Sequence, residues 1–308
     1  MRKPIQTACA LAVSCAFQFS ACLARGEVHA DKTVSGVLEK RDIFYTHDQN
    51  PNRSLDLFLP RDAVKPLPLV ILIHGGGWSG GDKAHFDYLA KVLAEKGFAA
   101  ASINYRLSKE AVWPAAAFDC KAAVRWFRAH SKEYSIDPNK IAVGGHSAGA
   151  HLSAFLAASN GVKKFDRGDN LDQSSDVQAE LWYSGVANLV TRATTRGYEV
   201  VQNPHSDESS LLGRPILENR ALAMDASPVS WVSARSAPFY FVAGTADKLV
   251  PPQQVDEMVQ ALNKFGIYSE VHMISGAGHA APEFWDVEHL NMMLTFLKRA
   301  LKLKFSTA

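Results

Sequence analysis

The chain has 308 residues, of which 47% are hydrophobic and 21% charged, and its formal net charge is +2 at pH 7. These values are typical of a globular protein with one large domain or two small ones. A charge so close to zero leaves no basic stripe of the kind that binds nucleic acid. The one dense basic stretch, residues 298–304, falls at the end of an expected helix and is interpreted as a solvated helix face.

Residues 1–30 have the layout of an export signal. Arg2 and Lys3 precede a stretch of apolar and small residues without a charge, and small residues near its end offer cleavage points. A second interpretation is a lipoprotein signal, in which residues 19–22 (FSAC) form the cleavage box and Cys22 becomes the lipidated first residue. We therefore expect an exported protein, either periplasmic or secreted, whose only link to a membrane would be a lipid on Cys22.

The cysteines leave no disulfide framework in the body of the chain. Three of the four, Cys9, Cys15 and Cys22, lie in the expected export segment, so Cys120 remains alone. Cys120 falls within an amphipathic helical pattern and is expected to be a small buried thiol rather than a nucleophile.

Strand and helix patterns alternate from residue 38 onward. Two short strands come first, at residues 42–46 and 54–60, and Leu55, Leu57 and Leu59 are expected to point inward. Later strands are apolar throughout, which is typical of a parallel sheet covered by helices; they are expected at residues 68–73, 98–105, 140–145, 181–186, 239–244 and 268–274. Helices are expected at residues 83–96, 114–131, 148–159, 251–265 and 284–302. The alternation predicts one doubly wound α/β domain over 31–308, preceded by an antiparallel pair.

A glycine-rich stretch, HGGGWSGGDK at residues 74–83, follows one of these strands. Glycines so dense allow the backbone to approach either a phosphate or an oxygen that becomes negative during a reaction. Neither the Walker phosphate loop nor the dinucleotide-binding loop fits the spacing. Gly76 and Gly77 are therefore the expected N–H donors to an oxyanion. His74 is expected to fix the loop through a hydrogen bond, and Trp78 either walls an acyl pocket or covers core.

A second glycine cluster contains G-x-S-x-G at residues 145–149, between an apolar run and a helical pattern. In this strand-turn-helix context, a serine held in a strained turn projects its hydroxyl as a nucleophile. We expect Ser147 to take that role, with Ala148 as a third oxyanion donor; the alternative is that Ser147 only caps the helix. His146 is a candidate for lining the pocket, and His151 is expected to be a helix histidine whose hydrogen bonds are satisfied.

Residues 188–230 break the alternation. About forty residues rich in Ser, Arg, Asn and Pro, with short helical pieces, separate two strands there. A connection of that length inside a compact domain is usually functional. It is interpreted as a small cap over the carboxyl edge of the sheet.

A serine nucleophile requires a general base and a carboxylate that orients it. In the sequence, Asp247 follows the strand at 239–244 and His279 follows the strand at 268–274, each after a short turn. Other nearby aspartates and histidines fall inside strand or helix patterns. The order serine, acid, histidine is the one expected when all three follow parallel strands of this fold.

The motifs HGGGWSGGDK, INYRL, GHSAGAHL, GTADKLVP and GAGH occur in this order, and with them the chain resembles the α/β-hydrolase esterases. It is most similar to the bacterial group that includes acetyl-xylan/feruloyl esterases and relatives of hormone-sensitive lipase. The resemblance covers about residues 38–302 and implies an α/β-hydrolase fold with a small cap insertion. It also implies a site made of the catalytic residues Ser147, Asp247 and His279 and the oxyanion donors Gly76, Gly77 and Ala148.

The expected function is that of an exported serine esterase working through an acyl-enzyme, without metal or cofactor. Its expected substrates are short-chain or carbohydrate-linked esters, either small molecules or attached to a polysaccharide. One alternative is an amidase, arylformamidase or peptidase with the same three residues. Another, of a different class, is a hydrolase-like binding protein without catalysis; such relatives usually lack a member of the triad, and none is missing here.

Overall fold

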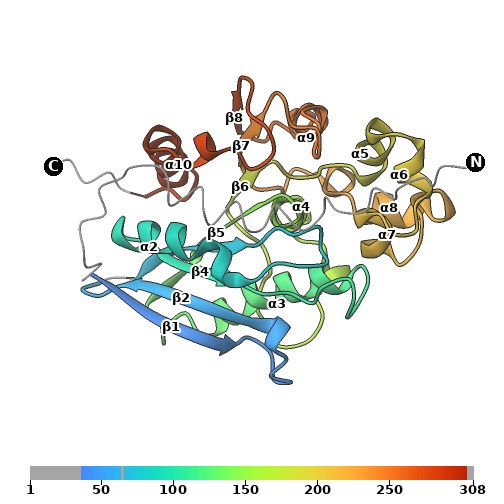
Figure 1. Cartoon of the computed structure of the whole chain (residues 1–308). Coiled ribbons are helices and arrows are strands. Elements are labelled where there is room, and N and C mark those ends of the chain that lie inside the picture. Colours follow the sequence, from blue (N-terminus) through green and yellow to red (C-terminus); the bar gives the residue numbers. More distant parts are fainter. Residues whose placement is uncertain (1–35, 64–65, 304–308) are drawn as a thin grey trace, which may run out of the picture. The chain divides into compact units, whose positions relative to one another are not determined.

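The computed structural model describes residues 36–63 and 66–303 (Figure 1). The export segment expected at residues 1–30, including Cys22, lies outside the described residues, as does the last lysine of the basic stretch at 298–304. Within the described part of the chain, no helix combines the length and apolar character needed to cross a bilayer.

One eight-stranded sheet organises the described residues, with the strand order β1-β2-β4-β3-β5-β6-β7-β8. The strands are β1 (Val37–Phe44), β2 (Ser54–Pro60), β3 (Leu67–Ile73), β4 (Ala99–Ile103), β5 (Ile136–His146), β6 (Ala179–Tyr183), β7 (Phe239–Gly244) and β8 (Ser269–Ile274). Strand β2 pairs antiparallel with β1 and β4, and every other pair in this sheet is parallel. The carboxyl ends of β3, β5, β7 and β8 therefore meet at one edge, where ligands bind in such sheets.

Alternate side chains of the central strands build two apolar cores, one on each face of the sheet. Leu69, Ile71 and Ile73 of β3 face a core covered by α3, α4 and α9, whereas Val70 and Leu72 face a core covered by α2 and α10. These helices are α2 (Asp87–Glu95), α3 (Ala115–Ala129), α4 (Ala148–Ala158), α9 (Gln253–Asn263) and α10 (Val287–Ala300). The predicted parallel sheet with helices on both faces is confirmed. Cys120 of α3 is a buried free thiol, as expected.

The segment between β6 and β7 forms a group of short helices, coloured yellow to orange in Figure 1. They are α5 (Leu189–Arg196), α6 (Tyr198–Gln202), α7 (Asp207–Leu212) and α8 (Arg220–Asp225), with 3₁₀ turns at Ile216–Glu218 and Pro228–Trp231. The short helical pieces expected between residues 188 and 230 are thus present. We refer to this segment as the cap.

Several boundaries differ from prediction, most of all in the first strand. It is predicted at 42–46, but β1 runs from Val37 to Phe44. A register shift between Lys40 and Ile43 interrupts its pairing with β2, and Asp42 in this bulge has a φ of 55°. The bulge breaks the alternation that a prediction relies on.

Strand β8 departs from the prediction in a different way. Its sequence predicts a strand buried on both faces, yet β8 is the edge of the sheet and Val271 and Met273 are exposed. Strand β2 shows the reverse: Leu55, Leu57 and Leu59 are buried as expected, but its other face is buried too. There, Lys83 donates a 2.7 Å hydrogen bond to the buried carboxylate of Asp56 on that face.

Candidate active site

Ser147 lies in a strained turn between the last residue of β5 and the first residue of α4. Its φ and ψ are 55° and −119°, outside the helical and strand regions that L residues prefer. Its N–H donates to the carbonyl of Tyr183 at the end of β6, over 2.9 Å, which fixes the turn to the sheet. Within the described residues the Ser147 side chain accepts no capping hydrogen bond. The N-cap alternative therefore does not account for this serine.

The glycines around Ser147 are required by close packing on β3. A methyl group placed on Gly145 would lie 2.6 Å from the Ile73 carbonyl oxygen. One placed on Gly149 would lie 2.6 Å from the carbonyl oxygen of His74 and closer still to that of Ile73. The spacing G-x-S-x-G thus reflects the contact between this turn and the end of β3.

Asp247 and His279 are paired at the same edge of the sheet. The Nδ1–H of His279 donates to Oδ2 of Asp247 over 2.7 Å. The other carboxylate oxygen, Oδ1, accepts the N–H groups of Leu249 and Val250 over 2.9 and 2.8 Å. Because the Asp247 side chain is 1% exposed and receives three hydrogen bonds, it holds the imidazole in one orientation. The lone pair of His279 Nε2 is then the free basic position.

His146 connects this pair to the serine turn. Its ring centroid lies 4.8 Å from that of His279, and it directly precedes Ser147 in the chain. Burial, together with His279 and the neighbouring His85, lowers the pKa of His146 well below the usual value, so this ring stays neutral at physiological pH. The structure places His146 in contact with the predicted base, as a buried side chain.

The glycine-rich loop after β3 lies directly beside Ser147. A methyl group on Gly75 would come within 3.3 Å of the Ser147 Cβ. The loop turns sharply, since the N–H groups of Ser79 and Gly80 both donate to the Gly76 carbonyl, over 3.1 and 3.0 Å. Gly76 and Gly77 have φ angles of 116° and 57°, which glycine adopts without strain.

Three backbone N–H groups are available at this point. In the described ranges, the hydrogen bonds found leave the N–H groups of Gly76, Gly77 and Ala148 without a protein acceptor. Ala148 is the first residue of α4, where the helix dipole favours a negative charge. The arrangement can therefore stabilise an oxyanion that forms on a group attached to Ser147.

His74 supports the glycine-rich loop from its buried position after β3. Nδ1–H of His74 donates to the carbonyl of Gly75 over 2.8 Å, and the His74 ring stacks on Tyr105 at 4.5 Å. Burial lowers the pKa of His74 to about 4. His74 thus fixes the loop by a hydrogen bond, as the sequence predicts.

His151 and Trp78 connect the loop, helix α4 and the cap. The indole N–H of Trp78 donates to Nδ1 of His151 over 3.1 Å, and Nε2–H of His151 donates to the Ala226 carbonyl in the cap over 2.7 Å. Both ring nitrogens are occupied, and burial lowers the pKa of His151 to about 4. The expectation of a satisfied helix histidine is confirmed. Trp78 is 2% exposed and belongs to the core, which is one of its two predicted positions.

Arg192, on cap helix α5, is a residue near the site that no sequence pattern predicts. Its guanidinium forms an ion pair with buried Glu208, donates from Nε to the Leu249 carbonyl over 3.3 Å, and lies 5.9 Å above the Trp78 ring. It therefore contacts the cap, the loop that follows Asp247 and the glycine-rich loop after β3 at once. Its sequence surroundings, LVTRATTR, are mostly polar and are equally common on solvated helices, so they do not predict a buried arginine.

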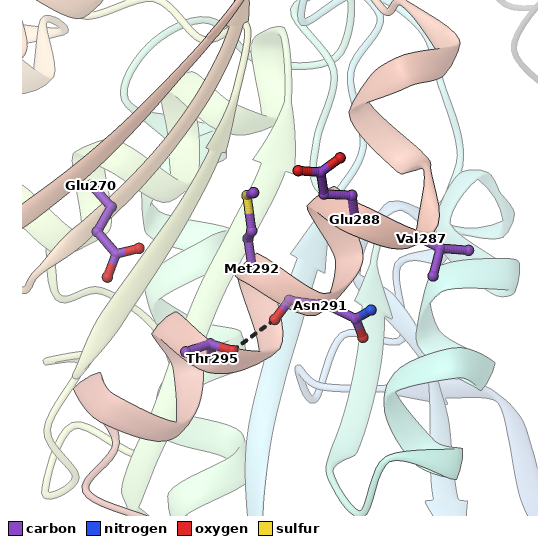
Figure 2. Close-up of a pocket in the computed structure, with 6 residues that line it drawn as sticks. All are labelled: Glu270, Val287, Glu288, Asn291, Met292 and Thr295. Carbon is purple, nitrogen blue, oxygen red and sulfur yellow. Dashed lines mark hydrogen bonds between the residues drawn. The ribbon is translucent and has the colours of Figure 1, made fainter.

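A shallow open groove lies elsewhere, between β8 and α10 (Figure 2). Its lining residues are Glu270, Val287, Glu288, Asn291, Met292 and Thr295. Glu270 is near the amino end of β8, whereas His279 follows the carboxyl end. The lining includes none of Ser147, Asp247 and His279, so the groove is separate from the site around Ser147.

The strand order, with a serine turn after β5 and an acid and a histidine after β7 and β8, defines an α/β-hydrolase. Within that class, a family model described as BD-FAE matches residues 55–262, and the chain belongs to this family. The resemblance to esterases inferred from the motifs is thereby confirmed.

Curated relatives and solved structures agree with this assignment. The "Probable carboxylic ester hydrolase LipM" of Mycobacterium tuberculosis is 34% identical over 215 residues, which cover 68% of this chain and 49% of that protein. A "Truncated form of carbohydrate esterase from gut microbiota" has a TM-score of 0.79 and 26% identity, covering 86% of this chain and 96% of that one.

A bifunctional GH43-CE protein of Bacteroides eggerthii has a TM-score of 0.78 and 29% identity, covering 85% of this chain and 38% of that one. The chain spans about half the length of LipM.

Proposed function

We propose that this chain is an exported serine hydrolase that cleaves carboxylic esters through an acyl-enzyme. The observation that carries the proposal is the His279–Asp247 pair, 2.7 Å apart, at the sheet edge where the strained Ser147 turn and the glycine loop also lie. The names of the relatives, which include carboxylic ester hydrolases and esterases, support the same reaction class.

In the proposed mechanism, His279 Nε2 takes the proton of Ser147 while the serine oxygen bonds to the ester carbonyl carbon. The N–H groups of Gly76, Gly77 and Ala148 bind the oxyanion of the tetrahedral intermediate. His279 then gives the proton to the leaving alcohol, and an acyl-Ser147 remains. A water molecule, deprotonated by His279, attacks the acyl carbon and releases the acid, which regenerates the serine.

We propose short acyl groups on small or carbohydrate-linked alcohols as substrates. Support comes from two similar structures, which are described as a carbohydrate esterase and a bifunctional GH43-CE protein. In the structure, the Trp78 side chain is part of the core. The cap contacts the glycine loop through Arg192, which lies over the Trp78 ring.

The test compares the wild-type chain with Ser147→Ala on p-nitrophenyl esters of increasing acyl length, acetylated xylan and methyl ferulate. Loss of the nucleophile should lower kcat/KM about 10⁴-fold or more. Undiminished turnover in the variant would exclude the mechanism. Faster wild-type hydrolysis of formyl-kynurenine or peptide anilides than of all esters would favour the amidase alternative. The distribution of the activity among host-cell fractions tests export.

The same enzyme should show a single acid limb in kcat/KM, because a histidine base works only when it is neutral. The fall is expected on the acid side of neutrality, where a histidine base takes up a proton. His74, His85 and His151, whose pKa values burial lowers to about 4, remain neutral through that range and do not account for it. A rate that stays flat down to pH 5 would contradict His279 as the base.

A further inference from the structure

The carboxylate of Asp207, at the start of cap helix α7, lies against the oxyanion loop. A methyl group placed on Gly77 would be 2.9 Å from Asp207 Oδ1 and 3.3 Å from Oδ2. Gly77 is one of the three residues whose N–H groups are proposed to bind the oxyanion. The cap carboxylate therefore lies beside a residue of the proposed oxyanion site.

The Asp207 side chain stays accessible to solvent although two arginines lie nearby. Its side chain is 42% exposed, and its contact with Arg192 Nη2 is long, at 3.8 Å. Arg192 is otherwise engaged, since it pairs with Glu208 and donates to the Leu249 carbonyl. Arg196 also faces Glu208, over 3.7 Å. The buried carboxylate of Glu208 thus has two arginine partners. The carboxylate of Asp207 keeps lone pairs that can accept hydrogen bonds from a ligand.

We propose that Asp207 is a specificity-determining residue that selects esters whose alcohol part carries hydroxyl groups. This inference rests on the proposed esterase function and narrows its substrate class. An ionised carboxylate only accepts hydrogen bonds, and neighbouring hydroxyls of a sugar or polyol offer donors to its two oxygens. The same negative charge repels an ester whose alcohol part carries a carboxylate.

Two matched pairs of acetyl esters test the selection. Acetylated methyl xyloside and cyclohexyl acetate differ in ring hydroxyls, and acetylsalicylate and phenyl acetate differ in one carboxylate. In Asp207→Asn, kcat/KM for the xyloside relative to cyclohexyl acetate should fall about tenfold, because a charge-assisted hydrogen bond is weakened. The ratio of acetylsalicylate to phenyl acetate should rise about tenfold, because the repulsion is removed. Glu218→Gln, which removes another exposed cap carboxylate, should leave both ratios unchanged.

The wild-type chain provides a second measurement that does not depend on a variant. Its discrimination against acetylsalicylate should shrink as NaCl is raised from low to high concentration, because salt screens the charge of Asp207. Equal changes on all four esters in Asp207→Asn, no change on any, or salt-independent wild-type discrimination would overturn the proposal. A wild-type chain inactive on all four esters would instead refute the proposed function itself.

Discussion

At the scale of single residues, the serine turn shows why its sequence pattern is so readable. Ser147 adopts a positive φ, and the two flanking glycines are in contact with the carbonyl groups that end β3. The strained turn and the close packing each restrict which residue type can stand at their position. The sequence pattern therefore predicts both features. Asp207 has no such signature, because an acidic residue after Ser206 is equally expected in any first helical turn.

Glu180, near the amino end of β6, is a residue that the proposed mechanism does not use. It is fully buried in β6, and its Oε1 accepts a 2.7 Å hydrogen bond from Ser153 Oγ in α4. Burial raises the pKa of Glu180 well above its usual value. The folded chain therefore holds a proton that the unfolded chain releases, once the pH exceeds the pKa of the unfolded state.

We expect Glu180→Gln to change how stability depends on pH. Between the unfolded and the folded pKa, the wild-type free energy of unfolding should fall with rising pH by about 1.4 kcal/mol per unit from this group alone. The glutamine variant lacks that contribution, so its advantage over wild type should grow from pH 5 to pH 8. Urea unfolding at several pH values measures it. A constant difference between the two proteins across this range would contradict a protonated Glu180.

At the scale of elements, the strands were more predictable than the contacts of the cap. Continuous apolar runs predict β3 and β7 because both faces of these strands are buried. The cap helices are predicted only as short pieces, since Arg192 and Glu208 are residue types typical of a solvated surface. Their burial depends on a pairing across sixteen positions of the chain, which no local pattern encodes.

The Arg192–Glu208 pair is expected to hold the cap on the site. Arg192→Met should lower the free energy of unfolding by about 3 to 5 kcal/mol, because buried Glu208 loses its principal partner. The double variant Arg192→Met/Glu208→Gln should recover much of that loss, since no unpaired charge remains. Thermal unfolding, followed with kcat/KM on a short ester, measures both effects.

Arg235→Met provides the control for the cap variant. Arg235 pairs with Asp176 at the surface, its side chain being 67% exposed, so a loss of at most about 1 kcal/mol is expected. Equal losses in Arg192→Met and Arg235→Met would show that the buried pair does not hold the cap.

At the scale of the whole molecule, the order of elements explains how a sequence could indicate the site. Parallel strands bring their carboxyl ends to one edge, so residues 100 positions apart could be assigned to one place from topology alone. The sequence does not predict which position in the sheet each of the preceding strands takes. Ser147 follows the central strand β5, whereas His279 follows β8, which the exposure of Val271 and Met273 marks as an edge.

This position of β8 has a consequence for local stability. An edge strand with few buried side chains opens at a lower free energy than the central strands. Opening of β8 would carry His279 away from Asp247 while β5 and the serine turn stay folded. We therefore expect activity to disappear at a lower urea concentration than the global unfolding signal, and the amides of β8 to exchange with solvent faster than those of β5. Coincident loss of activity and fold would show that the proposed base, His279, is held as firmly as the proposed nucleophile, Ser147.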